Sequence, residues 1–409
     1  MRRYVIVGNG IAGITAAQSI VRADSAAEVR VLSAEPYPYY QRPRLWELIA
    51  GEIKQDALYF RPPEWYAGRG IQVQLGVRVT AFDPQAHLLV LSDGSRVEYD
   101  RLLLATGGRA FVPPFDGADK KGVFSLRSLD DALAIKRQAQ VASTAAVIGG
   151  GLLGLETARA LLSAKLDVTV IEFAPHLLPR QLDEEGAQVL QSRLEAMGLR
   201  ILTGAATEAI LGDERATGVQ LGDGRVVDGQ VVLISTGIRS RVELAREAGL
   251  EVNRGLVVDE HLRTSAPGVY AAGDVAEFEG QVYGIIPAAI EQAQVAAANM
   301  VAGPSTGSGR SSAVYSGTVP STTLKIAGID LTCLGQATAT GDEFTILRQS
   351  DRANGIYRRL ALREGKIVGA ILLGDKQDVR VLKKLISTGR DVSAHRHRLL
   401  DDDFDLETW

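Results

Sequence analysis

Apolar runs alternate with helical patterns along the chain, and the same order of parts occurs twice. In each half, an apolar run enters a glycine-rich turn, a helical pattern follows, and two further apolar runs come later, the second ending in Thr-Gly. Between those later runs stands an Asp-Gly pair, which is a signal for a β-hairpin. The matched segments are 4–13 and 145–154, 28–32 and 167–172, 91–96 and 221–226, and 101–107 and 231–237. Because a whole order of parts repeats, we predict two copies of one strand–helix–strand unit.

Both glycine turns have the spacing GxGxxG between a predicted strand and a predicted helix, which is the context in which this motif binds dinucleotides. The first glycine permits the tight turn, the second lets the backbone approach a pyrophosphate, and the third lets helix and strand pack closely. The helix N-terminus then offers free N–H groups to the phosphates. The glycines are Gly8, Gly10 and Gly13 in the first copy and Gly149, Gly151 and Gly154 in the second. We therefore predict two bound dinucleotides, against the alternative of two Rossmann-like units without a nucleotide.

The composition bounds the class of protein. A chain of 409 residues, 46% hydrophobic and 23% charged, is typical of a globular protein with more than one domain. No apolar run reaches the length of about 18 residues that a spanning helix needs, and the sequence starts without a signal-peptide pattern, so we expect a cytoplasmic protein. The net charge of −4 argues against nucleic-acid binding. The single cysteine, Cys333, excludes an intramolecular disulfide, a Cys-x-x-Cys redox pair and a four-cysteine metal site.

The two glycine motifs, together with LLLATGGR, VLISTGIR and GVYAAGDVAEF, resemble the pyridine nucleotide-disulfide oxidoreductase superfamily over most of the chain. The resemblance implies an α/β fold with two Rossmann-like three-layer dinucleotide-binding domains, similar to glutathione reductase, and a small C-terminal α+β domain. It also implies FAD on the first glycine motif and NAD(P)H on the second. We predict a discontinuous FAD-binding domain at 1–110 and 244–308, an NAD(H)-binding domain at 111–243 and a C-terminal domain at 309–409.

The resemblance implies further residues at the FAD site. Asp274 is expected to accept hydrogen bonds from the ribityl hydroxyls. The helix that begins near Pro287 and Ala288 is expected to direct its positive end toward the flavin pyrimidine. The second strand ends at Ser33, where the family usually has an acidic residue, so we assign the adenosine ribose to Glu35. The full FAD prediction is Gly8, Gly10, Ile11, Ala12, Gly13, Glu35, Arg42, Pro43, Val79, Ala105, Thr106, Gly107, Gly273, Asp274, Pro287 and Ala288.

In the NAD half, the second strand ends in Glu172, which suits a ribose 2′-hydroxyl and repels a 2′-phosphate. Basic residues that would bind a phosphate are absent locally apart from Arg180, so NADH is favoured over NADPH. Glu156 has two interpretations. A carboxylate in the first turn after the third glycine suits the helix dipole alone, whereas the resemblance places it near the flavin N5 and the nicotinamide. The predicted NAD residues are Gly149, Gly151, Leu152, Leu153, Gly154, Glu172, Thr236 and Gly237.

The segment YPYYQRPRLWELIAG stands where related disulfide reductases carry a redox cysteine. It resembles the corresponding segment of NADH:rubredoxin and ferredoxin reductases, in which an Arg-Pro pair replaces that cysteine, and also the flavin module of assimilatory nitrite reductases. Related ferredoxin reductases have a lysine where this chain has Glu47, so we predict Arg44 as the partner of Glu156, and these two as the catalytic residues. The alternative for Arg42 and Arg44 is a solvated loop held by prolines.

The Gly/Ser/Pro stretch at 301–312 predicts a domain boundary. Beyond it, short strands and a final helix are predicted, and ALREGKIVGAILLG resembles the C-terminal domain of the same reductases. Cys333 lies in an alternating strand, where a buried small hydrophobe is favoured over a reactive thiol. Between residues 344 and 398, 13 Lys or Arg stand against 5 Asp or Glu, which indicates either a docking face for an acidic carrier or a solvated surface. The tail HRHRLLDDD lacks the spacing of a metal site, and no metal is predicted.

We therefore expect an NADH-dependent FAD reductase that passes electrons singly to a small rubredoxin- or ferredoxin-type carrier, without a thiol relay. A second enzyme hypothesis is an NADH oxidase or the flavin module of a nitrite-reductase-like assembly. The alternative from another class is a flavin-binding interaction protein. Both glycine motifs and Glu172 argue against it, because a scaffold need not keep a nicotinamide site. The sequence leaves the electron acceptor and the oligomeric state open.

Overall fold

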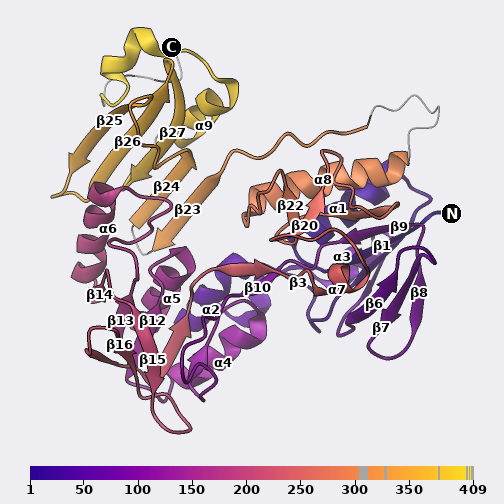
Figure 1. The fold of residues 1–409 in the computed structure, drawn as a ribbon, viewed down its shortest axis with the longest axis horizontal. Helices are drawn as coiled ribbons and strands as arrows, with labels where there is room; N and C mark the ends of the chain where they lie inside the picture. Colours follow the sequence, from indigo (N-terminus) through magenta and orange to yellow (C-terminus); the bar gives the residue numbers. More distant parts are fainter. Residues whose placement is uncertain (304–311, 327–328, 376–377, 402–403, 405, 407–409) are drawn as a thin grey trace. The chain divides into compact units, whose positions relative to one another are not determined.

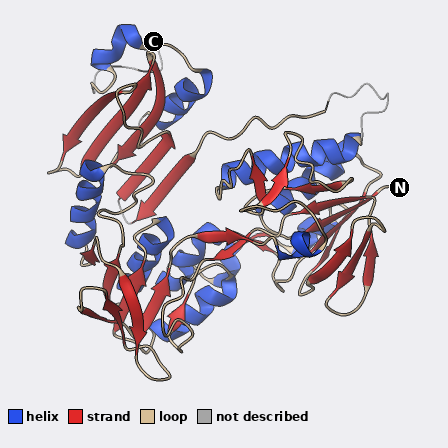
Figure 2. Cartoon of the chain, in the orientation of Figure 1, coloured by secondary structure: helices blue, strands red, loops and turns tan. Residues whose placement is uncertain are grey.

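The computed structural model describes residues 1–409 apart from 304–311, 327–328, 376–377, 402–403, 405 and 407–409 (Figure 1). The chain forms two compact units, which we describe separately. The first unit contains residues 1–42, 55–109 and 238–318, and the second contains 43–54, 110–237 and 319–409. Helices and strands alternate along both (Figure 2). Among the described residues, no helix is long and apolar enough to cross a membrane.

A five-stranded parallel sheet, in the order β21-β9-β1-β2-β5, forms the centre of the first unit. Its strands are β1 (Arg3–Val7), β2 (Glu28–Leu32), β5 (Ile71–Gln74), β9 (Arg101–Leu104) and β21 (Val269–Ala271). Strands β1, β9 and β21 are apolar along nearly their whole length because a parallel sheet is covered on both faces. Helices α1 (Ile11–Ala23) and α8 (Ile286–Ala302) pack against each other beside this sheet.

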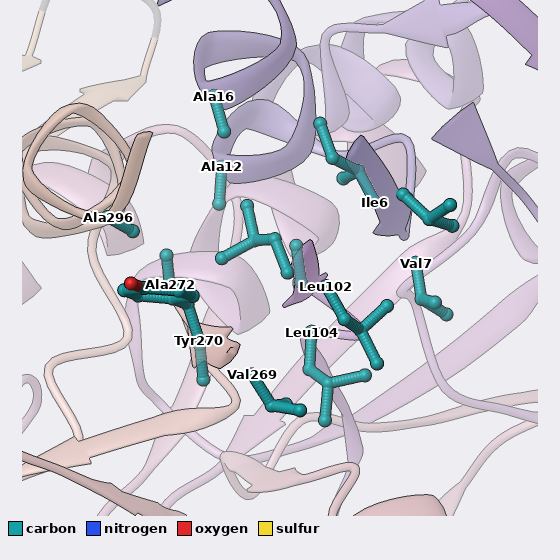
Figure 3. Close-up of a cluster of buried hydrophobic side chains, with 14 of the residues drawn as sticks. Ile6, Val7, Ala12, Ala16, Leu102, Leu104, Val269, Tyr270, Ala272 and Ala296 are labelled. Atoms are coloured by element: carbon teal, nitrogen blue, oxygen red, sulfur yellow. The ribbon is translucent and has the colours of Figure 1, made fainter. Parts of the chain in front are cut away.

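Small side chains allow α1 and α8 to approach closely. Ala16 on α1 and Ala296 on α8 are fully buried, and Ala12 is 6% exposed. Figure 3 shows these alanines in one cluster with Leu102 of β9 and Tyr270 of β21. A larger residue at these positions would overpack the core, which is destabilising. The close packing holds the N-terminal end of α1 beside the carboxyl ends of the strands.

Shorter elements complete the first unit. An antiparallel meander of β6 (Val79–Asp83), β7 (Leu88–Leu91) and β8 (Arg96–Glu98) joins the same core. The other elements are β3 (Tyr39–Tyr40), η2 (Gln55–Leu58), β4 (Tyr59–Arg61), α3 (Pro63–Ala67), β10 (Gly108–Ala110), β19 (Ile238–Ser240), α7 (Glu243–Glu247), β20 (Leu256–Val258) and β22 (Ala276–Phe278). The Asp-Gly hairpin predicted at 91–96 is confirmed, since Leu91 N–H donates to the Ser95 carbonyl at 2.9 Å.

The second unit repeats this plan. Its parallel sheet has the order β11-β18-β12-β13-β14, beside a meander β15-β16-β17. The strands are β11 (Val123–Phe124), β12 (Thr144–Ile148), β13 (Asp167–Ile171), β14 (Arg200–Leu202), β15 (Thr207–Leu211), β16 (Gly218–Leu221), β17 (Val226–Asp228) and β18 (Val231–Ile234). The helices are α2 (Leu45–Ala50), α4 (Leu129–Ala139), α5 (Leu152–Ser163) and α6 (Glu184–Ala196), and the short helix η1 (Arg42–Arg44) precedes α2. The second predicted hairpin is also confirmed, with Leu221 N–H bonded to the Arg225 carbonyl at 2.9 Å.

The C-terminal part of the second unit is an antiparallel sheet in the order β23-β24-β27-β26-β25. Its strands are β23 (Ser321–Ile326), β24 (Ile329–Gly335), β25 (Thr345–Asp351), β26 (Ile356–Arg363) and β27 (Lys366–Leu373). Helix α9 (Val379–Thr388) packs against β24 and β27 through Leu382 and Leu385, and η3 (Ser393–Arg398) follows. The predicted fold class, two parallel-sheet units of Rossmann type and a C-terminal α+β part, is confirmed.

Asp183 links this C-terminal sheet to α6 within the second unit. Its carboxylate caps the N-terminus of α6 by accepting from Gly186 N–H at 3.2 Å and also accepts from the Tyr357 hydroxyl at 2.6 Å. Nε of Arg359 lies 3.2 Å from the same carboxylate, and Arg359 is fully buried. Burial lowers the pKa of Arg359, whereas the Asp183 charge raises it. A buried cation is tolerated only when it is paired, and Asp183 supplies the opposite charge while two backbone carbonyls accept from the guanidinium.

The observed units do not follow the sequence order at every point. Residues 43–54, which lie inside the FAD-binding segment predicted at 1–110, group with the second unit, because α2 packs against α4 and α5. The predicted boundary stretch at 301–312 lies mostly outside the described residues. The three-domain division therefore stays a prediction.

Candidate functional site

Of the three glycines in the first turn, Gly10 alone leaves open space beside its backbone. Gly8 has a φ of +119°, and a Cβ there would lie 2.1 Å from the Ala105 carbonyl oxygen. A Cβ on Gly13 would lie 1.9 Å from the Gly8 carbonyl oxygen. At Gly10, by contrast, the only neighbour of a Cβ would be the Arg42 guanidinium, at 3.4 Å. Gly8 and Gly13 thus serve the turn and the packing of α1, and Gly10 leaves its backbone open to approach.

The N-terminus of α1 is uncapped at this opening. Gly10 is its N-cap residue and has no side chain to accept from the first N–H groups, and Ile11 and Ala12 form the first turn. Helix N–H groups and the positive end of the helix dipole suit a phosphate. The residues present therefore fit the pyrophosphate of a dinucleotide such as FAD.

Glu35 and Arg42 form one polar cluster beside Gly10. The Glu35 carboxylate accepts from the Tyr40 hydroxyl at 2.5 Å and from the Arg42 guanidinium at 2.5 Å. The Arg42 guanidinium also lies 4.9 Å from the Tyr40 ring centroid, over its face. Burial alone would lower the pKa of Arg42, but the nearby Tyr40 and Glu35 raise it, and the guanidinium stays charged. This arrangement fixes a cation next to the place where a pyrophosphate is expected.

The sequence prediction omitted Tyr40, which holds Glu35. It also omitted Asn9, whose side-chain oxygen accepts from the Tyr66 hydroxyl at 3.0 Å while its buried Nδ2 has no hydrogen-bond partner. The position of Asn9 inside the glycine motif was the available signal for it. For Tyr40 there was only its place in the aromatic run before Arg42.

The other predicted FAD residues gather where β9 and β21 end. Ala105, Thr106 and Gly107 follow β9, and Gly273 and Asp274 follow β21, its neighbour in the sheet. A Cβ on Gly273, which has a φ of +83°, would lie 3.1 Å from the Ala12 side chain of α1. Parallel strands present their carboxyl ends at one edge of the sheet, which is where ligands bind in folds of this kind. The first glycine turn and these residues therefore share one edge.

Polar contacts fix these strand ends. Thr106 Oγ1 donates to the Arg241 carbonyl at 3.0 Å, and the Ser240 hydroxyl donates to the Asp274 carbonyl at 2.6 Å. Gly273 N–H donates to Gln292 Oε1 at 2.8 Å, which leaves the buried Gln292 Nε2 without a hydrogen-bond partner.

Two of the predicted FAD residues belong to helix α8 and one to the meander. Pro287 and Ala288 occupy the first turn of α8, whose N-cap Ile285 provides no side-chain cap. Val79 begins β6, close to Val77, whose N–H donates to the Ser33 carbonyl at 2.8 Å. Val79 therefore lies near the end of β2, on the side of Glu35.

The second glycine turn repeats the geometry of the first. A Cβ on Gly149, which has a φ of +114°, would lie 2.3 Å from the Ser235 carbonyl oxygen, and one on Gly154 would lie 2.1 Å from the Gly149 carbonyl oxygen. A Cβ on Gly151 would meet no atom within 4 Å. Leu152 and Leu153 begin α5, which also has no side-chain cap. Here too the middle glycine leaves its backbone open.

Glu172 organises this second turn. Its carboxylate accepts from Gly150 N–H at 2.7 Å and from Ala174 N–H at 2.7 Å, so both oxygens have a backbone donor. A Cβ on Gly150 would lie only 3.1 Å from the Glu172 carboxylate and 2.6 Å from the Leu177 side chain. Gly150 thus leaves room for the Glu172 carboxylate. The GxGxxG pattern did not single it out, although the run of three glycines at 149–151 was a signal for it.

The loop after Glu172 closes over the same turn. Leu178 N–H donates to the Gly150 carbonyl at 3.2 Å, and Leu178 is buried with a φ of +50°. A bulky residue with this φ is uncommon and costs energy, so the surrounding contacts must hold it. On the other side of β12, Thr236 follows β18 and its hydroxyl donates to the Phe111 carbonyl at 2.7 Å, next to Gly237.

The predicted catalytic residues lie on α5 and just before α2. Arg44 makes a two-point ion pair with Glu47, with Nε 2.9 Å and NH2 2.6 Å from its carboxylate oxygens. This contact with Glu47 raises the pKa of Arg44. Glu156 is the fifth residue of α5, which has no acidic residue in its first turn, so the helix-dipole interpretation of Glu156 loses support. The pairing of Glu156 with Arg44 stays a prediction. Pro43, between the two arginines, groups with Arg44 in the second unit.

The single cysteine of the chain lies in the C-terminal sheet. Cys333 is in the middle of β24, 5% exposed, and its thiol donates to the Gln181 carbonyl at 3.3 Å. Burial raises the pKa of this thiol to about 12. It is therefore a packed, unreactive side chain, as the sequence predicted.

The sequences of two known protein families match this chain. The model of the pyridine nucleotide-disulphide oxidoreductases matches residues 2–299, and the model of the rubredoxin NAD+ reductase C-terminal domain matches residues 320–390. The chain belongs to the pyridine nucleotide-disulphide oxidoreductase family. Members of this family are flavin oxidoreductases that bind FAD and NAD(H), so two dinucleotide cofactors account for the two glycine turns.

The relatives that this chain matches carry the names of different enzymes. Nitrite reductase [NAD(P)H] of Bacillus subtilis (strain 168) is 36% identical over 394 residues, which are 96% of this chain and 48% of that protein. The NADH-rubredoxin oxidoreductase of Clostridium acetobutylicum is 30% identical over 388 residues, 95% of each chain. Among solved structures, the covalent putidaredoxin reductase–putidaredoxin complex matches with a TM-score of 0.88 at 27% identity, over 99% of this chain and 97% of that one. The chain spans about half the length of the nitrite and nitrate reductase relatives that it matches.

Proposed function

We propose that this flavoprotein accepts a hydride from NADH and passes electrons one at a time to a small redox protein of the rubredoxin or ferredoxin type. When bound, FAD supplies the conversion from two-electron to one-electron chemistry, and the protein contributes binding, orientation and electrostatics. The observation that carries the proposal is the pair of equivalent glycine turns combined with a sole thiol that is buried and unreactive. A disulfide relay, which related enzymes use, has no second cysteine in this chain.

For FAD, we assign the pyrophosphate to Gly10, the N–H groups of α1 and the guanidinium of Arg42. Glu35 orients Arg42 and retains lone pairs for the ribose hydroxyls, because a carboxylate can accept about four hydrogen bonds. Asp274 is assigned to the ribityl chain. The uncapped N-terminus of α8 at Pro287 is assigned to the pyrimidine end of the flavin, where it would stabilise negative charge.

For NADH, we assign the pyrophosphate to Gly151 and the adenosine ribose to Glu172. Two backbone N–H groups hold the Glu172 carboxylate in place. The carboxylate therefore repels the 2′-phosphate of NADPH, and NADPH is disfavoured. Glu156, with Arg44, is assigned to the environment of the nicotinamide and flavin. No general base is required for hydride transfer, so positioning is the main contribution of these side chains.

The C-terminal match at residues 320–390 and the names of two relatives support a small redox protein as the partner. An anaerobic visible-absorption titration tests the proposal. NADH is added first, and oxidised rubredoxin is added afterwards in the same cuvette. Bleaching of the flavin followed by reduction of rubredoxin is expected. A flavin that NADH does not bleach would overturn the NADH-dependent reductase.

A second candidate is the flavin module of a nitrite-reductase-type assembly. The observation that favours it is the 36% identity with a nitrite reductase of which this chain covers 48%. In that case NADH bleaches the flavin, rubredoxin stays oxidised, and the electrons pass to a redox domain that corresponds to the remaining half of that relative. Reduction of the separately produced remaining half of that relative would distinguish this candidate from the first.

A further inference from the structure

An exposed aromatic residue directly follows Glu172, the residue to which we assign the adenosine ribose. Phe173 follows Glu172 directly and is 79% exposed, although phenylalanine is among the residues most often buried. Elsewhere in the second unit, Val141 is 80% exposed after α4 and Val226 is 58% exposed at the start of β17. Neither of these valines adjoins a predicted nucleotide residue. Phe173 is thus exposed apolar surface at the predicted nucleotide site.

The backbone on both sides of Phe173 is fixed. Besides its two carboxylate contacts, Glu172 uses its carbonyl to accept from Ala205 N–H at 3.0 Å. The Ala174 carbonyl accepts from Gly204 N–H at 2.8 Å, and Ala174 N–H donates to the Glu172 carboxylate at 2.7 Å. The ring is therefore displayed from a held strand end and not from a loose loop. Gly204, which pairs with this backbone, has open space where a Cβ would stand, since no atom lies within 4 Å of that position.

We propose that Phe173 is the platform on which the adenine ring of NADH stacks. The inference rests on the proposed NADH site, in which Glu172 binds the adenosine ribose. Adenine is attached to that same ribose, so the base must lie within one sugar ring of the Glu172 carboxylate, where the Phe173 ring is exposed. Every base presents a π-face, and stacking on an aromatic side chain needs no hydrogen-bond partner. Phe173 would therefore strengthen binding of the adenosine half and leave the nicotinamide half unaffected.

Direct binding provides the first test. ADP-ribose, which contains the adenosine half but no nicotinamide, is titrated into the FAD-loaded protein by isothermal calorimetry. Phe173→Ala is expected to weaken binding about tenfold, the loss typical of removing one base-stacking ring. Phe173→Trp is expected to restore it, and Val141→Ala, an equally exposed position, is the control that leaves it unchanged. Equal affinities for the wild type and Phe173→Ala would overturn the proposal.

A comparison of two hydride donors provides the second test. Reduced nicotinamide mononucleotide lacks the adenosine half of NADH, and ferricyanide serves as an acceptor that needs no docked protein. Phe173→Ala is expected to lower kcat/KM about tenfold with NADH and to leave it unchanged with the mononucleotide. An equal loss with both donors would assign Phe173 to the flavin environment or to folding and overturn the proposal. Neither test uses a carrier protein. Failure of the enzyme to reduce rubredoxin would therefore count against the proposed carrier and leave the role of Phe173 standing.

Discussion

The choice between NADH and NADPH is predicted to depend on the charge of Glu172. Glu172→Gln keeps the size of the side chain but can accept from only one of the N–H groups of Gly150 and Ala174, because its NH2 group is itself a donor. Hydrogen bonds to charged acceptors contribute about 1.5–3 kcal/mol, against about 0.5–1.5 kcal/mol for neutral ones. The variant is therefore expected to lose about 1–2 kcal/mol of stabilisation of the turn. This loss corresponds to a roughly tenfold lower kcat/KM for NADH.

The effect on NADPH has the opposite sign. Two unit charges about 4 Å apart repel by about 1 kcal/mol in water and by about 4 kcal/mol at the effective dielectric constant near a protein surface. Glu172 is half-buried, so an intermediate repulsion of about 2–3 kcal/mol is expected against a 2′-phosphate. Its removal should raise the ratio of kcat/KM for NADPH to that for NADH on the order of a hundredfold. Glu172→Arg should shift the ratio further, since it adds an attractive charge.

The assay is steady-state reduction of ferricyanide with each nucleotide, at one ionic strength. Glu208→Gln removes an exposed carboxylate from β15 in the same unit and is the matched control. If Glu172→Gln and Glu172→Arg keep the wild-type cofactor ratio, the carboxylate does not face the 2′ position and the assignment of Glu172 is wrong.

Three further predictions concern cofactor binding, the thiol and domain packing. Gly10→Val should fold, because a Cβ there would lie 3.4 Å from the Arg42 guanidinium and near no other atom, but should purify colourless since the side chain blocks the pyrophosphate; a fully yellow, folded variant would contradict this. Cys333→Ser should leave turnover intact because the hydroxyl can donate to the same carbonyl, and a large loss of rate would revive a thiol mechanism. Asp183→Ala should lower the free energy of urea unfolding by about 4 kcal/mol, from a lost helix cap and an unpaired buried Arg359. The double variant Asp183→Ala/Arg359→Met should recover much of that loss, and equal stability of the single and double variants would refute the role of the buried charge.

The sequence determined the features that depend on local chemistry. Gly8 and Gly149 occupy backbone with φ above +110°, which side chains rarely adopt, so their positions mark the two turns directly. The Asp-Gly pairs mark the hairpins for the same reason. The apolar runs of β1 and β12 identify strands covered on both faces, and the repeat of these parts gives the two nucleotide-binding units.

Only the tertiary structure determined which side chains meet. Tyr40 and Arg42 both bond to Glu35, and Gly150 bonds to Glu172 across 22 residues, because the fold brings strand ends and loops together. The burial of Arg359 depends on Asp183, 176 positions earlier in the sequence, and no local pattern encodes such a pairing. Local backbone preferences act over a few residues, whereas packing joins segments far apart in the chain. The glycine turns could therefore be predicted from sequence, and the polar contacts that orient the residues around them could not.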